Sequence, residues 1–209
     1  MVLVRAPPTS EALPHLAGVV LCGGAGRRMG ADKALLAVEG ERLVERAARR
    51  LGAVADPIIL ACGNRSLSLT GCATVSDVVH GAGPLAGIVA GLRSSPHPLT
   101  ALVAVDMPWL DAGLLGRMAA EWDGEDALIP LSAAGAEPLH GVYAGSALPI
   151  LEAALTAGRL RLLAALDGLR VRRFDAAELV GAAIAARFAT NLNTAEDLVT
   201  LASSLTADA

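Results

Sequence analysis

Aromatic residues and cysteines are scarce in this sequence, and each scarcity excludes a class of protein. Phe, Trp and Tyr make up only 2% of the 209 residues, so alanine, leucine and valine have to build the core. The three cysteines, Cys22, Cys62 and Cys72, are too few and too widely spaced for a disulfide framework or a zinc site. We expect them to be buried free thiols in a protein of the reducing cytoplasm.

Surplus positive charge and long apolar runs are also missing. The net charge of −4 offers no basic excess to favour a nucleic-acid backbone. No apolar run reaches membrane-spanning length without a charged or turn residue, and the first residues lack the apolar stretch of a signal peptide. With 54% hydrophobic and 18% charged residues, the composition is that of a globular protein. We therefore expect neither a nucleic acid nor a membrane as a partner.

Short apolar runs alternate with helical patterns through the first half of the chain. AGVVL (17–21), PIILAC (57–62) and TALVAVD (100–106) are typical of buried strands. Residues 41–53 and 83–95 have the apolar spacing of helices. That alternation predicts an α/β fold, with a mostly parallel sheet and helices on both faces. A further strand is expected over 73–77 and a further helix over 111–122.

The second half of the chain is less regular. The patterns predict strands over 126–130, 138–144 and 171–174, and helices over 146–158, 161–169 and 193–205. Thr194 followed by Asp197 resembles a capping box at the start of the last helix. Because no repeat or linker interrupts the chain, we expect one domain over residues 17–209, preceded by a loose leader over 1–16.

A glycine-rich stretch, LCGGAGRRMGADK (21–33), follows the first predicted strand. Its glycine spacing is one residue too long for the dinucleotide fingerprint G-x-G-x-x-G. It is not a P-loop either, because Lys33 has no glycine before it and no serine or threonine after it. What remains is a loop of glycines and backbone N–H groups with two cations, Arg28 and Lys33. Such a loop favours a phosphate-binding role over a plain surface turn.

Aspartates end two of the predicted strands. Ligands of parallel sheets bind at the carboxyl ends of the strands, where Asp77, Asp106 and the glycine-rich loop are expected to meet. The sharp turn after Asp106 would leave its carboxylate at the rim, and Mg²⁺ prefers one or two carboxylates plus phosphate oxygens. Asp106 could instead cap the next helix, but Asp111 is better placed for that. Asp77, taken alone, could be a turn residue.

Five blocks of the sequence together resemble a known family. The opening stretch matches the pattern L-x-G-G-x-G-x-R-M-G-x-D-K, and the resemblance runs from about residue 17 to 200. The chain is similar to the nucleotidyltransferases that act on molybdopterin, above all the molybdenum cofactor guanylyltransferases. The other four blocks are SDVVHGAGPLAGI (76–88), AVDMPWL (104–110), EPLHGVYAGSALPIL (137–151) and FATNLNTAEDL (188–198).

The resemblance implies a fold and a reaction. The fold is a Rossmann-like three-layer α/β/α sandwich of the nucleotide-diphospho-sugar transferase type. The reaction transfers GMP from GTP to the phosphate of molybdopterin with Mg²⁺ and releases pyrophosphate. The implied partners are GTP, molybdopterin, and molybdoenzymes or other cofactor-synthesis proteins.

The resemblance also implies roles for single residues. Arg28, Lys33 and Asp106 would be catalytic, and Asp106 would bind the metal ion. The residues expected to contact the nucleotide are Leu21, Cys22, Gly23, Gly24, Lys33, Asp77 and Asp106. Because the attacking phosphate is already anionic near neutral pH, catalysis needs positioning and charge stabilisation, and no side-chain nucleophile.

Two questions stay open at this stage. Some members of the family carry an asparagine at the end of the second strand as a base contact, where this chain has Ala61 or Cys62. A cytidylyltransferase on molybdopterin, or a nucleotidyltransferase on another phosphorylated acceptor, therefore remains an alternative. A third alternative is a binding domain without catalytic activity. The joint presence of Arg28, Lys33 and Asp106 argues against it.

Further residues are candidates for the side of the crevice that would hold the second substrate, but each also has an ordinary structural explanation. A lone histidine is more often satisfied by local hydrogen bonds, an arginine at a helix start is often solvated, and an asparagine can be a turn or cap residue. The candidates are His140, Tyr143, Arg159 and Arg161; Asn191 and Asn193 could reach either the metal or the pterin.

Overall fold

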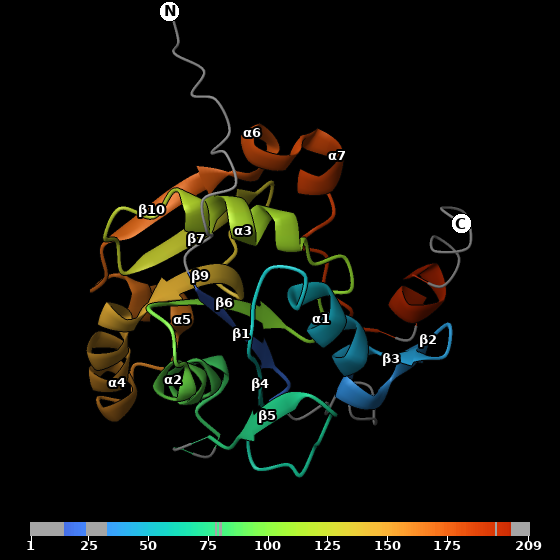
Figure 1. The fold of residues 1–209 in the computed structure, drawn as a ribbon, viewed down its shortest axis with the longest axis horizontal. Helices are drawn as coiled ribbons and strands as arrows, with labels where there is room; N and C mark the ends of the chain where they lie inside the picture. Colours follow the sequence, from blue (N-terminus) through green and yellow to red (C-terminus); the bar gives the residue numbers. More distant parts are fainter. Residues whose placement is uncertain (1–14, 24–32, 78, 80, 195, 202–209) are drawn as a thin grey trace, which may run out of the picture.

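The centre of the molecule is a mostly parallel sheet (Figure 1). The computed structural model describes residues 15–23, 33–77, 79, 81–194 and 196–201. Within them the sheet has eight strands in the order β10-β7-β9-β6-β1-β4-β5, with β8 paired to β7. The strands are β1 (Leu16–Leu21), β4 (Ile58–Ala61), β5 (Cys72–Val75), β6 (Leu99–Ala104), β7 (Ala127–Ser132), β8 (Gly135–Ala136), β9 (His140–Ala144) and β10 (Val171–Asp175).

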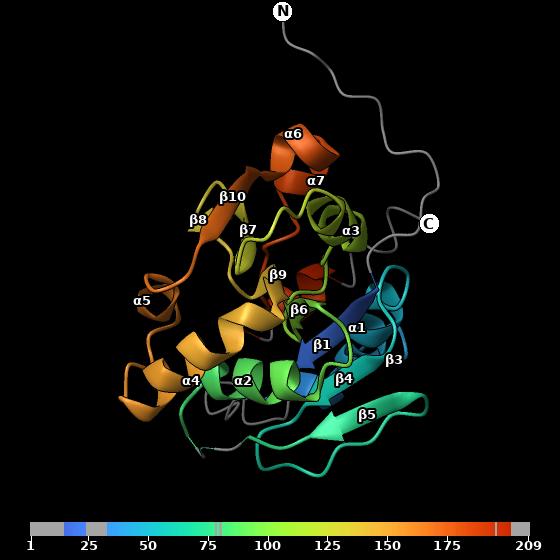
Figure 2. The ribbon, with the colours of Figure 1, turned by 60° about the vertical axis from the view of Figure 1, so that its left-hand side comes forward.

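Helices cover both faces of this sheet. On one face, side chains of β1 such as Leu16 and Val20 pack with α1 and α3. On the other face, Val19 and Leu21 pack with α2 and α4, which lie side by side (Figure 2). The predicted α/β sandwich with three layers is therefore confirmed. These helices are α1 (Leu43–Leu51), α2 (Pro84–Ser94), α3 (Ala112–Ala120) and α4 (Leu148–Thr156).

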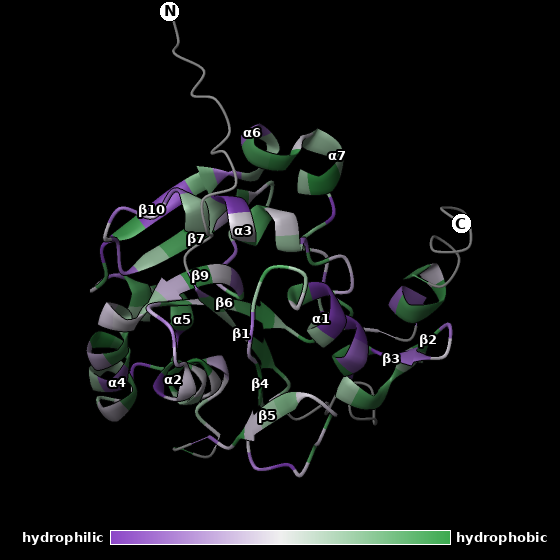
Figure 3. Cartoon of the chain, viewed as in Figure 1, coloured by the Kyte–Doolittle hydropathy of each residue, from purple (hydrophilic) through white to green (hydrophobic). Residues whose placement is uncertain are grey.

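The central strands are buried on both faces, as their unbroken apolar sequences predict. Every residue of β1 and β6 is buried, and the two strands pair in parallel from Leu16–Leu99 to Leu21–Ala104. Figure 3 shows hydrophobic colour along the inner strands and hydrophilic colour on α1 and β3. Parallel pairing brings the carboxyl ends of β1, β4, β5 and β6 to one edge of the sheet.

Strand β9 breaks the parallel order. It runs antiparallel to both of its neighbours, β6 and β7. Because the short connection through β8 cannot carry the chain across the sheet, β9 returns beside β7 in the opposite direction. Alternation of strand and helix predicts parallel neighbours only where a helix separates two strands.

The stretch from 33 to 51 differs from the single helix expected over 41–53. It starts with the 3₁₀ turn η1 (Lys33–Leu35) and a small hairpin of β2 (Ala37–Val38) and β3 (Glu41–Arg42). Glu39 and Gly40 take positive φ values of 52° and 82° at its tip. Helix α1 then begins where the Glu45 carboxylate accepts the backbone N–H of Arg42 at 2.9 Å.

Shorter elements complete the described residues. The capping box expected at Thr194 is present, because the backbone N–H of Thr194 donates to Asp197 at 2.9 Å and that of Asp197 donates to the Thr194 hydroxyl at 3.2 Å. Residues 196–201 are helical. None of the helices that the structure describes is long and apolar enough to cross a membrane. Strand β1 begins at Leu16, and residues 1–14 of the expected leader lie outside the described residues. The remaining elements are η2 (Gly145–Ala147), α5 (Leu162–Leu166), α6 (Ala176–Val180) and α7 (Ala182–Ala185).

Candidate active site

A crevice of about 890 Å³ opens at the carboxyl edge of the sheet. Its walls are formed where four parallel strands end: residues 21–23 at the end of β1, 61–65 at the end of β4, Asp77 after β5 and 104–106 at the end of β6. The first turn of α2 closes one side, and Lys33 and Leu139 also border it. This is the position at which open α/β sheets bind ligands.

Lys33 and Asp106 meet in this crevice, although 73 positions separate them in the sequence. The Lys33 ammonium donates to Asp106 Oδ2 at 2.9 Å, to the Leu192 carbonyl at 2.5 Å and to Asn193 Oδ1 at 3.3 Å. The side chains of Lys33 and Asp106 are only 23% and 24% exposed. One cation is thus surrounded by three oxygens from two distant segments of the chain.

The Asp106 loop, residues 106–111, leads from β6 towards α3 and has the Asp106 carboxylate at its start. The helix cap is Asp111, whose Oδ1 accepts the Leu114 backbone N–H at 2.7 Å. The alternative in which Asp106 caps α3 is therefore excluded. The backbone carbonyl of Asp106 accepts the N–H of Leu192 at 2.8 Å, so residues 192 and 193 are tied to Asp106 as well as to Lys33. Sequence reasoning named Asn193 as a candidate but missed Leu192, whose contribution comes from its backbone.

Asp77 is positioned by two close glycines. Its backbone N–H donates to the Gly63 carbonyl at 3.1 Å. A Cβ atom at Gly63 would lie 3.6 Å from Asp77 Oδ2, and one at Gly87 would lie 3.7 Å from Oδ1. Gly63 also has a φ of +65°, which favours glycine. The half-buried carboxylate therefore fits between the turn after β4 and helix α2, at the wall of the crevice.

Leu21, Cys22 and Gly23 join the strands at the point where β1 ends. The N–H groups of Cys22 and Gly23 both donate to the Ala61 carbonyl, at 2.9 and 3.1 Å, and the Leu21 carbonyl accepts the Val105 N–H at 3.1 Å. These two N–H groups are thus engaged within the sheet in this structure. Gly24 and Arg28, which the sequence also assigns to the site, lie outside the described residues.

His140 and Tyr143 are fully buried and do not line the crevice, so for His140 the alternative of local hydrogen bonding applies. The Asp111 N–H donates to His140 Nε2 at 3.0 Å, and the Tyr143 hydroxyl donates to the Pro138 carbonyl at 2.8 Å. Burial lowers the pKa of His140 to about 4 and raises the pKa of Tyr143. His140 is thus a neutral, locally bonded histidine. Because β9 starts only at His140, the preceding Leu139 borders the crevice instead.

The remaining candidates do not join the site. Arg159 and Arg161 are exposed in the connection between α4 and α5 and do not line the crevice, as their solvated interpretation predicts. Asn191 donates to the nearby Ala189 carbonyl at 3.2 Å. The three cysteines, all of which the structure describes, form no disulfide. Cys22 and Cys62 are buried as expected, whereas Cys72 is only half-buried.

The oxygens around Lys33 suit a hard divalent cation. Mg²⁺ takes carboxylate, carbonyl and amide oxygens and usually adds phosphate oxygens of its substrate. Asp106, Leu192 and Asn193 supply one oxygen of each kind to the Lys33 ammonium. Among the described residues there is no cluster of three or more histidines, cysteines and carboxylates for a metal such as zinc. The donor set therefore fits a metal ion that arrives with a phosphorylated ligand.

Comparisons with known proteins give a consistent result. A family model described as the MobA-like NTP transferase domain matches residues 18–171. A probable molybdenum cofactor guanylyltransferase from Natronomonas pharaonis is 38% identical over 163 residues, which are 73% of this chain and 80% of that protein. One from Pelotomaculum thermopropionicum is 33% identical over 183 residues, which are 87% of this chain and 89% of that protein.

Solved structures share the fold. Molybdopterin-guanine dinucleotide biosynthesis protein A from Archaeoglobus fulgidus superimposes with a TM-score of 0.76 at 28% identity, covering 92% of this chain and all of that one (100%). The 2-C-methyl-D-erythritol 4-phosphate cytidylyltransferase from Thermus thermophilus has a TM-score of 0.64 at 19% identity and covers 92% of this chain and 99% of its own. The second likeness extends to the fold alone.

Proposed function

The chain belongs to the MobA-like NTP transferase family, and we propose that it transfers GMP from GTP to the phosphate of molybdopterin with Mg²⁺, releasing pyrophosphate. It is a nucleotidyltransferase. The observation that carries the proposal is the meeting of Lys33, Asp106 and Asn193 at the edge of the sheet where the crevice opens. We assign the reaction to one domain over residues 17–209.

In this proposal the side chains of the site contribute by binding and neutralising the charges of the metal ion and the phosphates. Asp106 would hold Mg²⁺ with the Leu192 carbonyl and Asn193 beside it, and the bound ion would neutralise phosphate charge. Lys33, with Arg28, would offset the charge that builds on the leaving pyrophosphate. Asp77 and the main chain of residues 21–24 would orient the nucleotide. These assignments need no general base, because the attacking phosphate monoester is largely deprotonated at pH 7.

Lys33 has to change partners in this proposal. Its ammonium lies on Asp106 in the structure, at 2.9 Å. A carboxylate attracts a divalent cation more strongly than it attracts an ammonium group. An ammonium group released beside a triphosphate can in turn pair with the phosphate oxygens. The side chain of Lys33 is therefore expected to leave Asp106 for the phosphates when the metal–nucleotide complex binds.

The test is turnover with defined substrates. The protein is incubated with Mg²⁺, molybdopterin and either GTP or CTP, and pyrophosphate release and dinucleotide formation are followed. We expect pyrophosphate and the guanine dinucleotide with GTP. Preference for CTP would reassign the base, and no turnover with either nucleotide would overturn the proposal.

A further inference from the structure

Hydrogen bonds hold the backbone of the Asp106 loop at several points, both within the loop and to other parts of the chain. Within the loop, the Leu110 N–H donates to the Met107 carbonyl at 3.1 Å, and both side chains are buried. At its two ends, Asp106 is bonded to Leu192 and Asp111 to His140. Two carbonyls between these points, of Pro108 and Leu110, are bonded by side chains of helix α1.

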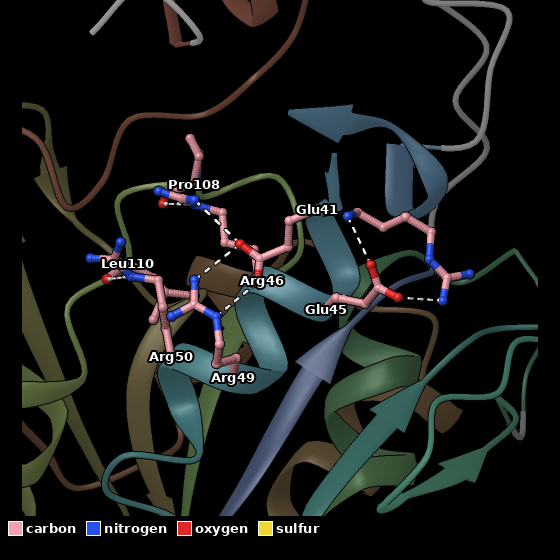
Figure 4. A network of polar contacts seen from close by, with 8 residues as sticks. Glu41, Glu45, Arg46, Arg49, Arg50, Pro108 and Leu110 are labelled. Carbon is pink, nitrogen blue, oxygen red and sulfur yellow. Dashed lines mark hydrogen bonds and ion pairs between the residues drawn. The ribbon is translucent and has the colours of Figure 1, made fainter. Parts of the chain in front are cut away.

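The side chains that reach these carbonyls are arginines on one face of α1 (Figure 4). Arg46 Nε donates to the Pro108 carbonyl at 3.3 Å, and Arg50 Nε donates to the Leu110 carbonyl at 3.0 Å. Residues four apart on a helix share a face, so a single helix holds two successive points of the loop. The bonds span 62 and 60 positions of sequence.

Burial makes these arginines costly unless they are bonded. The Arg46 side chain is only 10% exposed, and its other partner, Glu41, is 3.4 Å away. Arg50 is half-buried. Its pKa is lowered, first by desolvation and second by the positive charge of the nearby Arg46. A guanidinium taken out of water has to recover hydrogen bonds from the protein. Here the carbonyls of the Asp106 loop supply them.

Arg49 on the same helix provides a contrast. Its side chain is 62% exposed and makes two hydrogen bonds to Glu41, at 2.7 and 3.0 Å. Figure 4 shows Glu41 between Arg46 and Arg49, with Arg50 turned towards Leu110. Arg49 thus has the same charge and lies on the same helix as the other two arginines, but the hydrogen bonds that the structure describes for it go to the Glu41 carboxylate and not to the backbone of the Asp106 loop.

We propose that Arg46 and Arg50 are positioning residues for Asp106: they hold the Pro108 and Leu110 carbonyls so that the carboxylate at the start of the loop faces the crevice. The inference rests on the proposed function, in which Asp106 holds the metal ion. Groups that fix the orientation of a metal ligand affect affinity although they never touch the metal. Loss of either arginine leaves a carbonyl unbonded and lets the loop relax away from the crevice.

The test measures metal binding and compares matched variants. Mn²⁺ is titrated into the protein in the presence of a GTP analogue with a methylene α–β bridge, and free Mn²⁺ is followed by its electron paramagnetic resonance signal. We expect Arg46→Met and Arg50→Met each to weaken Mn²⁺ binding about tenfold. Arg49→Met, which removes the same charge, should stay within about twofold of the unchanged protein. Nucleotide affinity measured without metal should not differ between the three variants.

Conservative variants cover the case in which a methionine variant fails to fold. Arg46→Lys and Arg50→Lys keep the charge and one donor nitrogen, and thermal denaturation confirms that each is folded before titration. They should fall between the unchanged protein and the methionine variants in Mn²⁺ affinity.

Three results would contradict the inference, and they differ from one another. Equal Mn²⁺ affinity in all variants would show that the arginines serve only stability. An equal loss in the Arg49 variant would show that bulk charge, and not the loop, is responsible. No nucleotide-dependent Mn²⁺ binding in the unchanged protein would remove the metal site itself, and with it the proposed function.

Discussion

Lys33 has two assignments that one position of its side chain cannot satisfy. In the structure its ammonium occupies the oxygens of Asp106, Leu192 and Asn193. The proposed reaction places the same ammonium on the phosphates and gives those oxygens to Mg²⁺. In the proposed reaction the lysine would therefore compete with the metal ion, and removing it should affect metal affinity and nucleotide affinity in opposite directions.

Lys33→Met tests this competition. Without nucleotide, the variant should bind Mn²⁺ several-fold more tightly than the unchanged protein, because no ammonium blocks Asp106. Its affinity for GTP without metal should fall, by roughly tenfold for the loss of one charge-assisted phosphate contact. Calorimetric titration measures both, with Arg49→Met as the charge-matched control. Weaker Mn²⁺ binding in the Lys33 variant would contradict competition.

His140 gives the protein a specific sensitivity to acid. Its pKa is lowered to about 4 by burial, so the unfolded chain takes up a proton below the ordinary value of 6.5 while the folded chain does not. Folding stability should therefore be complete above pH 6.5 and fall by up to about 3 kcal/mol as the pH drops to 4. Urea unfolding at pH 7 and pH 4.5 measures this loss. His140→Asn should show a clearly smaller loss, and an equal loss in that variant would rule His140 out as its cause.

At the scale of elements, a glycine in α2 allows this helix to pack closely against β1. A Cβ atom at Gly91 would lie 2.7 and 2.8 Å from the two methyl groups of Val19, a buried residue of the central strand. Alanine gains about 1 kcal/mol over glycine as a helix former. Overpacking a rigid core costs typically about 1–3 kcal/mol. Because valine on a central strand cannot turn away, the clash should outweigh the gain.

Gly91→Ala is therefore expected to lower the free energy of unfolding by about 1 kcal/mol or more. The urea midpoint should fall, with no direct effect on the crevice residues. An unchanged or higher midpoint would mean that α2 can shift on the sheet.

The sequence predicted those elements whose own residues determine them. The buried strands β1, β4 and β6 have almost entirely apolar sequences, and a glycine or aspartate lies two residues beyond each end, where parallel strands have to end together. The caps at Asp111 and Thr194 depend on residues three positions apart. Such local patterns also fixed the edge at which Asp77, Asp106 and Lys33 were expected to meet.

Long-range contacts explain what the sequence did not predict. The antiparallel insertion of β9 depends on which neighbours compete for the edge of β6, and the apolar pattern HGVYA is the same for either direction. The burial of His140 follows from that pairing. The bonds of Arg46 and Arg50 to backbone carbonyls had no sequence signal, because any residue can supply a carbonyl.

At the scale of the whole molecule, the site joins the two ends of the described chain. Lys33 lies 159 and 160 positions from Leu192 and Asn193, yet all of them surround one point at the rim of the crevice. The family model ends at residue 171, so these two contacts lie beyond the part that it matches. The proposed cation site would therefore be complete only with the C-terminal segment folded back onto the sheet.

The most direct test of the proposed reaction follows the phosphorus atoms of GTP. The protein is supplied with Mg²⁺, molybdopterin, and GTP labelled with radioactive phosphorus at either the α or the γ position, and the products are separated. We predict that the α label enters the dinucleotide, the γ label leaves in pyrophosphate, and both transfers are lost in a folded Asp106→Asn variant. Release of the γ label as inorganic phosphate with no α label in the dinucleotide, or full transfer by the Asp106 variant, would contradict it.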